Sequence, residues 1–360
     1  MYYLGLDVGS SSVKAAIVDA KSGKSILSVH EPKNEMGINS LNNDWAEQDP
    51  NMWWKYTCDA IKRACKESNI DSKKISSVGI SYQMHGLVVV DKNGSPLRDS
   101  IIWCDSRAVN IGNEAFEKLG QEKCMCHLLN SPGNFTASKL KWVKDNEPNI
   151  YEKIYKYMLP GDFIAYKLTG QINTTRNGLS EGIIWDYKNN STADWLLDHY
   201  GIDSNLTPDL VDNFSNQGTT NLKSSNETGL NVGVPITYRA GDQPNNALAL
   251  NVFDNGEVAA SGGTSGVIYS ITNNLDSNEP SRINHFAHVN YNNNNKSIGK
   301  LLCINGAGIQ YRWLRNHSTH ESYEKMNEVA ANIPVGSEGV SVIPFGNGSE
   351  RMLDNKNIGT

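Results

Sequence analysis

The first 30 residues hold three short runs in which apolar side chains recur at about every second position. This period of two indicates β-strands that bury one face. Turn-forming glycine and serine residues separate the runs, so each connection is short enough for a hairpin. The pattern predicts an antiparallel meander of three strands over residues 4–9, 13–19 and 25–30.

A helical period follows the meander. Asp49 and Pro50 are a typical N-cap and first helical position, and apolar residues then recur at spacings of three and four. We expect an amphipathic helix over residues 50–68 and a buried strand over residues 75–81. Strands and helices that alternate along a chain predict an α/β fold.

The elements beyond residue 85 are shorter. We predict strands over residues 87–91, 236–239, 258–261 and 267–271 and one that ends at Trp103, and helices over residues 108–119, 136–146, 162–168, 244–250 and 309–315. The polar stretch 189–231 is expected to form connections. A chain of this length should form two domains, which we place at residues 1–254 and 255–360.

The composition is that of an ordinary globular protein, with 38% hydrophobic and 20% charged residues among 360. A formal net charge of −6 argues against general binding to nucleic acid or acidic membranes, because both need concentrated Lys and Arg. No apolar run approaches the ~20 residues that span a bilayer, and no basic leader precedes the first strand. We therefore expect a cytoplasmic protein, with neither nucleic acid nor membrane as a partner.

Two turns that share one glycine-hydroxyl pattern lie far apart in the chain. They are Gly9-Ser10-Ser11-Ser12 and Gly263-Thr264-Ser265. Such turns present successive backbone N–H groups and hydroxyls, which suit phosphate oxygens. Asp7 ends the first strand, where its carboxylate either holds a divalent cation or only forms a turn. Lys14, next to the first turn, either supports phosphate charge or is an ordinary exposed lysine.

Polar residues also follow other expected strands. Asp242 comes after the strand at residues 236–239, where it either enters a cleft or caps the next helix. His85 comes after the strand at residues 75–81, and without further context a core or surface histidine is the ordinary interpretation. Asp105 either forms a structural pair with Arg107 or helps to shape a binding pocket.

Five motifs occur in a fixed order: Leu4-Gly5-Leu6-Asp7-Val8-Gly9-Ser10-Ser11-Ser12-Val13-Lys14, Gln83-Met84-His85-Gly86, Trp103-Cys104-Asp105-Ser106-Arg107, Ala240-Gly241-Asp242 and Gly263-Thr264-Ser265-Gly266-Val267. Together they resemble the FGGY carbohydrate kinases, and within that family the xylulokinase branch. The resemblance extends over essentially the whole chain. It implies a two-domain α/β fold around a cleft, with the ribonuclease-H-like core shared by sugar kinases, actin and heat-shock chaperone ATPases.

The resemblance also implies a role for each motif. Asp242 would be the general base that accepts the proton of the attacking sugar hydroxyl, and Asp7 would hold Mg²⁺. The residues expected to shape the sugar pocket are Met84, His85, Gln83, Gln243, Trp103 and Asp105. Those expected to bind the phosphates of ATP are Gly9, Ser10, Ser11, Ser12, Lys14, Gly263, Thr264 and Ser265.

The implied activity is phosphorylation of D-xylulose to D-xylulose 5-phosphate, with ATP and Mg²⁺. The alternatives are another ketose, polyol or gluconate kinase of the family, or an actin-like or chaperone-like ATP-binding protein without a sugar substrate. A homodimer is left open. In the family a Gly-Gly-Gly-Ala-like segment late in the second domain holds adenosine. Because this chain stops at Thr360, we expect an incomplete second domain and weak binding of MgATP.

Overall fold

Five strands form the sheet that carries the first glycine-hydroxyl turn. The structure, a computed structural model, describes residues 1–263, 266–277, 279–304, 307–318 and 322–342. Strands β1 (Tyr2–Val8), β2 (Val13–Asp19) and β3 (Ser25–Glu31) form an antiparallel meander. Strands β5 (Ile75–Tyr82) and β13 (Ile236–Gly241) extend the sheet in parallel, in the order β13-β5-β1-β2-β3. The predicted meander is therefore confirmed, to within one or two residues at its ends.

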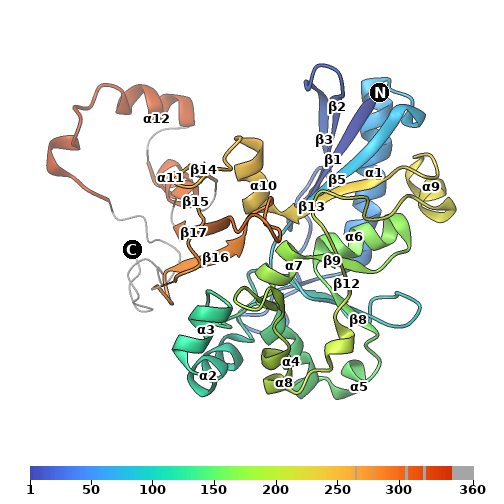
Figure 1. Ribbon diagram of the computed structural model, residues 1–360. Helices are drawn as coiled ribbons and strands as arrows, with labels where there is room; N and C mark the ends of the chain where they lie inside the picture. The colour runs from blue at the N-terminus through green and yellow to red at the C-terminus, as the bar shows by residue number, and fades with distance from the viewer. Residues whose placement is uncertain (264–265, 278, 305–306, 319–321, 343–360) are drawn as a thin grey trace.

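Two helices cover one face of this sheet (Figure 1). Helix α1 (Pro50–Ser68) contacts β2 and β3, and α6 (Pro160–Thr169) contacts β5 and β13. Both helices contribute to one hydrophobic core with the inward side chains of the strands. Helix α1 has the bounds that the sequence predicts, because Asp49 caps it and Pro50 opens it, while Asn69 ends it in the left-handed conformation.

A largely helical region continues from this sheet and packs around a second hydrophobic core, to which buried residues of the second sheet also contribute. Its helices are α2 (Val109–Leu119), α3 (Gln121–His127), α4 (Thr136–Asn146), α5 (Pro148–Tyr151), α7 (Arg176–Glu181) and α8 (Asp194–Tyr200). Its short strand pairs are β4 (Glu47–Gln48) with β7 (Ser100–Ile101), β6 (Val88–Val90) with β8 (Lys156–Met158), β9 (Asn173–Thr175) with β12 (Asp209–Val211), and β10 (Trp185–Asp186) with β11 (Ser191–Thr192).

The expectation that residues 189–231 only form connections is wrong. This stretch contains β11, α8, β12 and a further helix, α9 (Leu222–Thr228), which contacts α1 and α6. Helices α8 and α9 have seven residues each, about two turns. A helix this short repeats its apolar pattern too few times for the period to stand out in the sequence. Helix α9 is also almost entirely polar.

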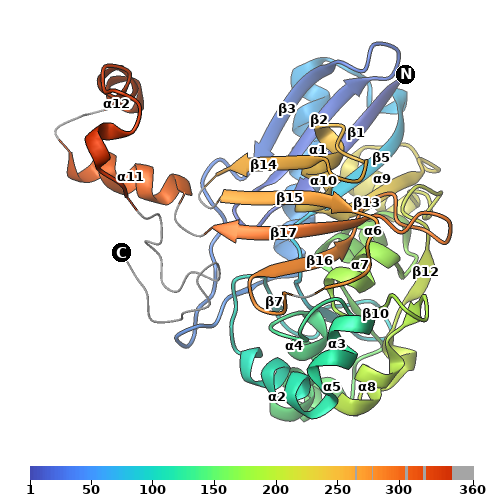
Figure 2. The ribbon, with the colours of Figure 1, turned by 60° about the vertical axis from the view of Figure 1, so that its left-hand side comes forward.

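A second sheet follows helix α10 (Asp242–Ala249). Strands β14 (Val258–Gly262), β15 (Gly266–Thr272), β16 (Ile283–Ala287) and β17 (Ile298–Ile304) are antiparallel in the order β14-β15-β17-β16. Figure 2 shows this sheet beside α10, with β16 next to α7. Helices α11 (Ala307–His317) and α12 (Tyr323–Ala330) come after it. Across the described ranges, no helix is both long and apolar enough to cross a bilayer.

Candidate active site

The parallel strands bring three of the predicted motifs to one edge of the first sheet. Tyr82 at the end of β5 pairs with Val8 of β1 on one side and with Gly241 of β13 on the other. The residues that follow these strand ends are therefore neighbours, because parallel strands end at the same edge of a sheet. Gly9, Gln83 and Asp242 follow them in the sequence. The sheet thus assembles the site from three segments, of which the first and last are more than 230 residues apart in the sequence.

The first glycine-hydroxyl turn is held by backbone and side-chain contacts. The Gly9 N–H donates to the Ser12 carbonyl at 3.0 Å, which closes the turn. Two further contacts come from outside it: the Gln48 amide donates to the Ser10 carbonyl at 2.7 Å, and the Met36 N–H donates to the Ser11 carbonyl at 2.8 Å. The turn is therefore held by hydrogen bonds both within the hairpin and from residues outside it.

Asp7 and Lys14 face each other across the hairpin. They are register partners in β1 and β2, and the Lys14 ammonium lies 3.0 Å from the Asp7 carboxylate. Both side chains are accessible to solvent. Surface ion pairs of this kind contribute little stability and are easily rearranged. A phosphate could therefore draw Lys14 away and leave Asp7 available for a cation.

The second turn is described only in part. Gly262 pairs with Gly266 at the ends of β14 and β15, and the Gly263 carbonyl accepts a hydrogen bond of 2.8 Å from the N–H of Gly308. Gly308 lies in the first turn of α11, so this helix begins beside the hairpin. Thr264 and Ser265, which were predicted to bind phosphate, lie outside the described residues.

Asp242 is the first residue of α10 and lies near Asp7. The helix begins at Asp242 rather than at Pro244, and Gly241 is its N-cap residue, so the Asp242 side chain does not serve as the cap. Burial raises the pKa of Asp242 to about 7, and the negative charge of Asp7 adds to this shift. Hydrogen bonds from Gln243 and the charge of Lys14 oppose it. A carboxylate with this pKa is a competent proton acceptor near neutral pH.

Met84 packs against the residue that precedes Asp242. A Cβ atom on Gly241 would stand 2.5 Å from the Met84 Cγ and 2.5 Å from the Glu181 Oε2, so this position has room only for glycine. Gln83 is buried, and its N–H donates to the Val8 carbonyl at 2.9 Å. The Gln-Met pair therefore contacts both the first strand and the start of α10.

His85 has its backbone in the left-handed region, with φ of 61°. This conformation is uncommon for a residue other than glycine, and such residues gather at functional sites. The His85 Nδ1 lies 2.8 Å from the Glu181 carbonyl, which can only accept, so Nδ1 carries a proton. The ring of His85 also packs against those of Phe135 and Phe286, at centroid distances of 4.8 and 5.1 Å.

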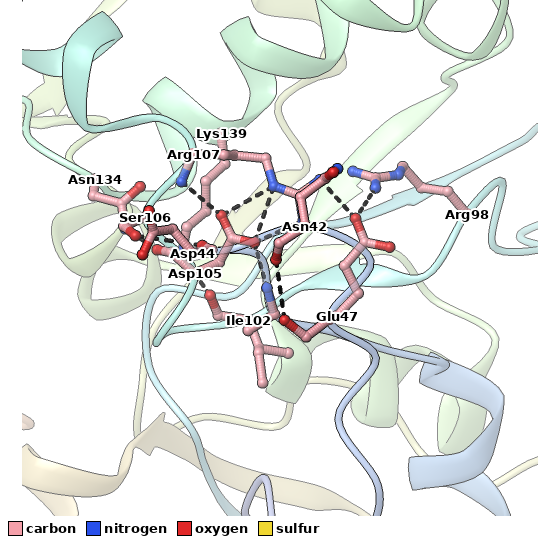
Figure 3. Close-up of polar contacts among 12 residues, drawn as sticks. Asn42, Asp44, Glu47, Arg98, Ile102, Asp105, Ser106, Arg107, Asn134 and Lys139 are labelled. Carbon is pink, nitrogen blue, oxygen red and sulfur yellow. Dashed lines mark hydrogen bonds and ion pairs between the residues drawn. The ribbon is translucent and has the colours of Figure 1, made fainter.

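Trp103 and Asp105 differ in their surroundings. The Trp103 indole is half exposed, and its N–H lies 3.4 Å from the Ser10 hydroxyl, beside the first turn. The Asp105 carboxylate is fully buried, and it accepts hydrogen bonds from the Arg107 guanidinium and from the Ala46 N–H (Figure 3). This geometry favours the structural Asp–Arg pair for Asp105 over a sugar contact.

Sequence reasoning missed three buried residues that surround these groups. Gln48 accepts a hydrogen bond from the Trp53 indole while its amide binds the first turn. Glu181 is 2% exposed beside Met84, and burial raises its pKa well above the usual range, with the charge of Asp242 adding to the shift. Lys139 is fully buried in α4 and donates to the His85 carbonyl. A single polar residue within a helix or strand gives no sequence signal of burial, so these three could not be singled out.

Asp7 is the residue best suited to a magnesium ion. Within the described ranges no group of three His, Cys, Asp or Glu residues could hold a metal. Mg²⁺ commonly binds one or two carboxylates and takes its remaining ligands from substrate phosphates and water. An accessible carboxylate beside a phosphate-binding turn fits that mode of binding.

Comparison with known proteins gives one family. The N-terminal domain of the FGGY family of carbohydrate kinases matches residues 2–249. The xylulose kinase of Staphylococcus xylosus is 29% identical over 346 residues, which are 96% of this chain and 70% of that protein. The xylulose kinase of Bacillus subtilis is 27% identical over 350 residues, 96% of this chain and 68% of that protein.

Solved structures of sugar kinases have the same fold. A xylulose kinase from Rhodospirillum rubrum superposes with a TM-score of 0.84 at 22% identity, covering 96% of this chain and 70% of its own. A gluconate kinase from Lactobacillus acidophilus has a TM-score of 0.81 at 22% identity, with coverages of 96% and 68%. Plasmodium falciparum glycerol kinase, solved with ADP, has a TM-score of 0.80 at 20% identity, with coverages of 95% and 70%.

These likenesses confirm the predicted ribonuclease-H-like fold. The match to the family extends over more than two thirds of the sequence and includes the first turn, the Gln-Met-His-Gly motif and Asp242. The chain belongs to the FGGY family of carbohydrate kinases, which transfer a phosphoryl group from ATP to a sugar.

Proposed function

We propose that this chain phosphorylates D-xylulose at O5 and that Asp242 is the general base. The observation that carries the proposal is the position of Asp242 after β13, at the sheet edge where the Gln-Met-His turn and Asp7 also lie, together with a pKa raised to about 7. Phosphoryl transfer needs an oriented hydroxyl and a group that accepts its proton late in the reaction. A partly buried carboxylate next to a sugar pocket meets both needs.

The sugar would bind between Asp242 and the turn after β5. Met84 supplies an apolar wall, and the His85 imidazole offers a hydrogen-bonding group to a sugar hydroxyl. Gln83 and Gln243 offer amide groups, and the exposed indole of Trp103 can pack against the sugar beside the first turn. The pocket would thus belong to the proposed first domain, residues 1–254.

ATP would lie between the two hairpins with its phosphates on the glycine-hydroxyl turns. Backbone N–H groups of residues 9–12, the Lys14 ammonium and the second turn at residues 263–265 would bind the phosphate oxygens. Magnesium held by Asp7 would neutralise charge on the transferring phosphoryl group. We assign residues 255–360 to the nucleotide side of the cleft because β14, β15 and the start of α11 surround the second turn.

The base is tested with Asp242→Asn, which keeps the size of the side chain and removes its charge. We expect kcat to fall by about 10² or more and the sugar Kd to stay within roughly tenfold. Asp59→Asn, an exposed carboxylate on α1, is the matched control and should leave kcat unchanged. A kcat for Asp242→Asn within a factor of five of the parent would rule out this role.

The substrate is tested by measuring ADP release with D-xylulose, other ketoses, gluconate and glycerol. Kinases of gluconate and glycerol share this fold with nearly the same TM-score, so fold likeness alone does not choose among these sugars. D-Xylulose should give the highest kcat/KM, because hydroxyl groups that pair with buried polar side chains contribute most to discrimination. Equal activity on glycerol, or greater activity on gluconate, would contradict the assignment of D-xylulose.

A further inference from the structure

Lys139 is a lysine with no exposed surface in the first turns of α4. Its ammonium donates two hydrogen bonds of 2.9 Å, one to the carbonyl of His85 and one to the carbonyl of Ile102. Lysine is almost never fully buried, because removing an ammonium from water is costly. Solubility and surface charge do not explain why a lysine is buried here. Its two contacts with main-chain carbonyls indicate a structural reason for the burial.

Charge pairing does not supply that explanation. Asp105, the carboxylate whose charge acts on Lys139, has its ion pair with Arg107, and Arg107 also pairs with Glu47 (Figure 3). Burial lowers the pKa of Lys139 to about 7, and the charge of Asp105 opposes this only in part. The ammonium therefore acts mainly as a hydrogen-bond donor to two loops.

Those two loops both lead into the proposed sugar pocket. The first carbonyl belongs to His85 itself, whose backbone lies in the left-handed region and whose ring is held from the other side by the Glu181 carbonyl. The second belongs to Ile102, the residue before Trp103, whose indole lies beside Ser10. The Lys139 ammonium thus contacts the backbone of His85 and the backbone next to Trp103, and both side chains belong to the proposed sugar pocket.

We propose that Lys139 is a positioning residue for sugar binding, which holds the His85 turn and the Ile102–Trp103 segment at the spacing that the sugar requires. The proposal rests on the proposed function, since it takes the sugar pocket to lie at His85 and Trp103. An ammonium suits this role because its three donors can reach two carbonyls from different directions. Methionine has a similar length and no donor, so it would remove the Lys139 hydrogen bond from each of the two carbonyls.

The test compares Lys139→Met with Lys141→Met. Lys141 lies on the same helix, but it is partly exposed and pairs with Asp145, so it serves as the matched control. Calorimetry should show the Kd for D-xylulose raised by about 10- to 100-fold in Lys139→Met and unchanged within twofold in Lys141→Met. The KM for ATP should change by less than twofold in both. A purely structural role would lower the thermal stability of Lys139→Met while leaving the sugar Kd of the folded protein unchanged.

A second measurement needs no sugar. The imidazole nitrogen resonances of His85, assigned with His85→Asn, report its tautomer and its hydrogen bond to Glu181. They should move in Lys139→Met and stay in place in Lys141→Met. An unchanged His85 spectrum, together with a sugar Kd within twofold of the parent, would overturn the role of Lys139. A parent protein that binds none of the tested sugars, with a His85 spectrum that still moves, would instead overturn the proposed function and leave Lys139 as the residue that orders the turn.

Discussion

Asp7 and Asp242 lie at the same edge of the first sheet, but the surroundings of their carboxylates differ. Asp7 is accessible and paired with Lys14, whereas Asp242 is largely shielded from water and carries the raised pKa. Burial disfavours the charged form, and the negative charge of Asp7 disfavours it further. This difference in environment supports the proposed roles of Asp7 as a cation ligand and of Asp242 as a proton acceptor, although the residue type is the same.

The pH profile follows from this assignment. A base must be ionised to act, so kcat/KM should fall about tenfold per pH unit once the pH drops below the Asp242 pKa of about 7. Lys14→Met removes a positive charge that lowers this pKa, so its acidic limb should move to higher pH. Lys24→Met, an exposed lysine in the same meander, should leave the limb in place. Activity that is independent of pH down to pH 5 would exclude Asp242 as the titrating base.

At the scale of the element, helix α1 shows how local chemistry sets a boundary. The Asp49 carboxylate accepts a hydrogen bond of 2.8 Å from the Asn51 N–H, and Pro50 needs no donor at the first helical position. The buried face of the helix then packs on β2 and β3, which carry the first turn. Helix α1 thus supports the hairpin that the phosphates would contact.

Loss of this cap should weaken the fold without altering the site. Asp49→Ala is expected to lower the free energy of unfolding by about 1 kcal/mol, because one N-terminal N–H of α1 loses its partner. Asp59→Ala, in the exposed middle of the same helix, should cost less than about 0.5 kcal/mol. Urea denaturation of the two variants measures the difference, and equal losses would show that the cap has no special contribution.

At the scale of the whole molecule, polar side chains of the helical region form hydrogen bonds with the backbone at β16, the edge strand of the second sheet. We call this set of hydrogen bonds the clasp. Asn130 both donates to the His285 carbonyl at 2.6 Å and accepts from the His285 N–H at 2.9 Å. Ser180 accepts from the Ala287 N–H at 2.8 Å, and Asn177 donates to the carbonyls of Ala287 and His288, both at 2.7 Å. These contacts satisfy strand β16 where another strand would otherwise pair.

The clasp should be a large contributor to stability. Asn177→Ala removes the side-chain donor of the Ala287 carbonyl, whereas the His288 carbonyl keeps the Tyr291 N–H, so we expect the free energy of unfolding to fall by about 1 to 3 kcal/mol. Amide hydrogen exchange in β16 and β17 should accelerate as well, because these strands lose their attachment to α7. Asn146→Ala, an exposed asparagine on α4, is the control and should change stability by less than about 0.5 kcal/mol. Unchanged exchange in β16 would contradict the clasp.

Sequence patterns were enough to predict the strands and helices whose signals lie within a few neighbouring residues. The meander and α1 were predicted because alternation and an Asp-Pro cap lie within a few residues of one another. Helices α7, α8 and α9 were missed because each has seven residues or fewer, and a period needs several repeats to be recognised. For Asp105, the sequence left two alternatives open, and the contacts with Arg107 and the Ala46 N–H favour the structural one.

The sequence by itself determined the fold class, the family and most residues of the candidate site, because motifs such as Gln83-Met84-His85 carry their chemistry in adjacent positions. Only the tertiary structure decided which groups are buried and what they contact. The raised pKa of Asp242, the contact between Met84 and Gly241, and the burial of Glu181 and Lys139 all arise between segments far apart in the chain. Desolvation and hydrogen bonding depend on the folded surroundings of a group, and no local pattern of residues records those surroundings.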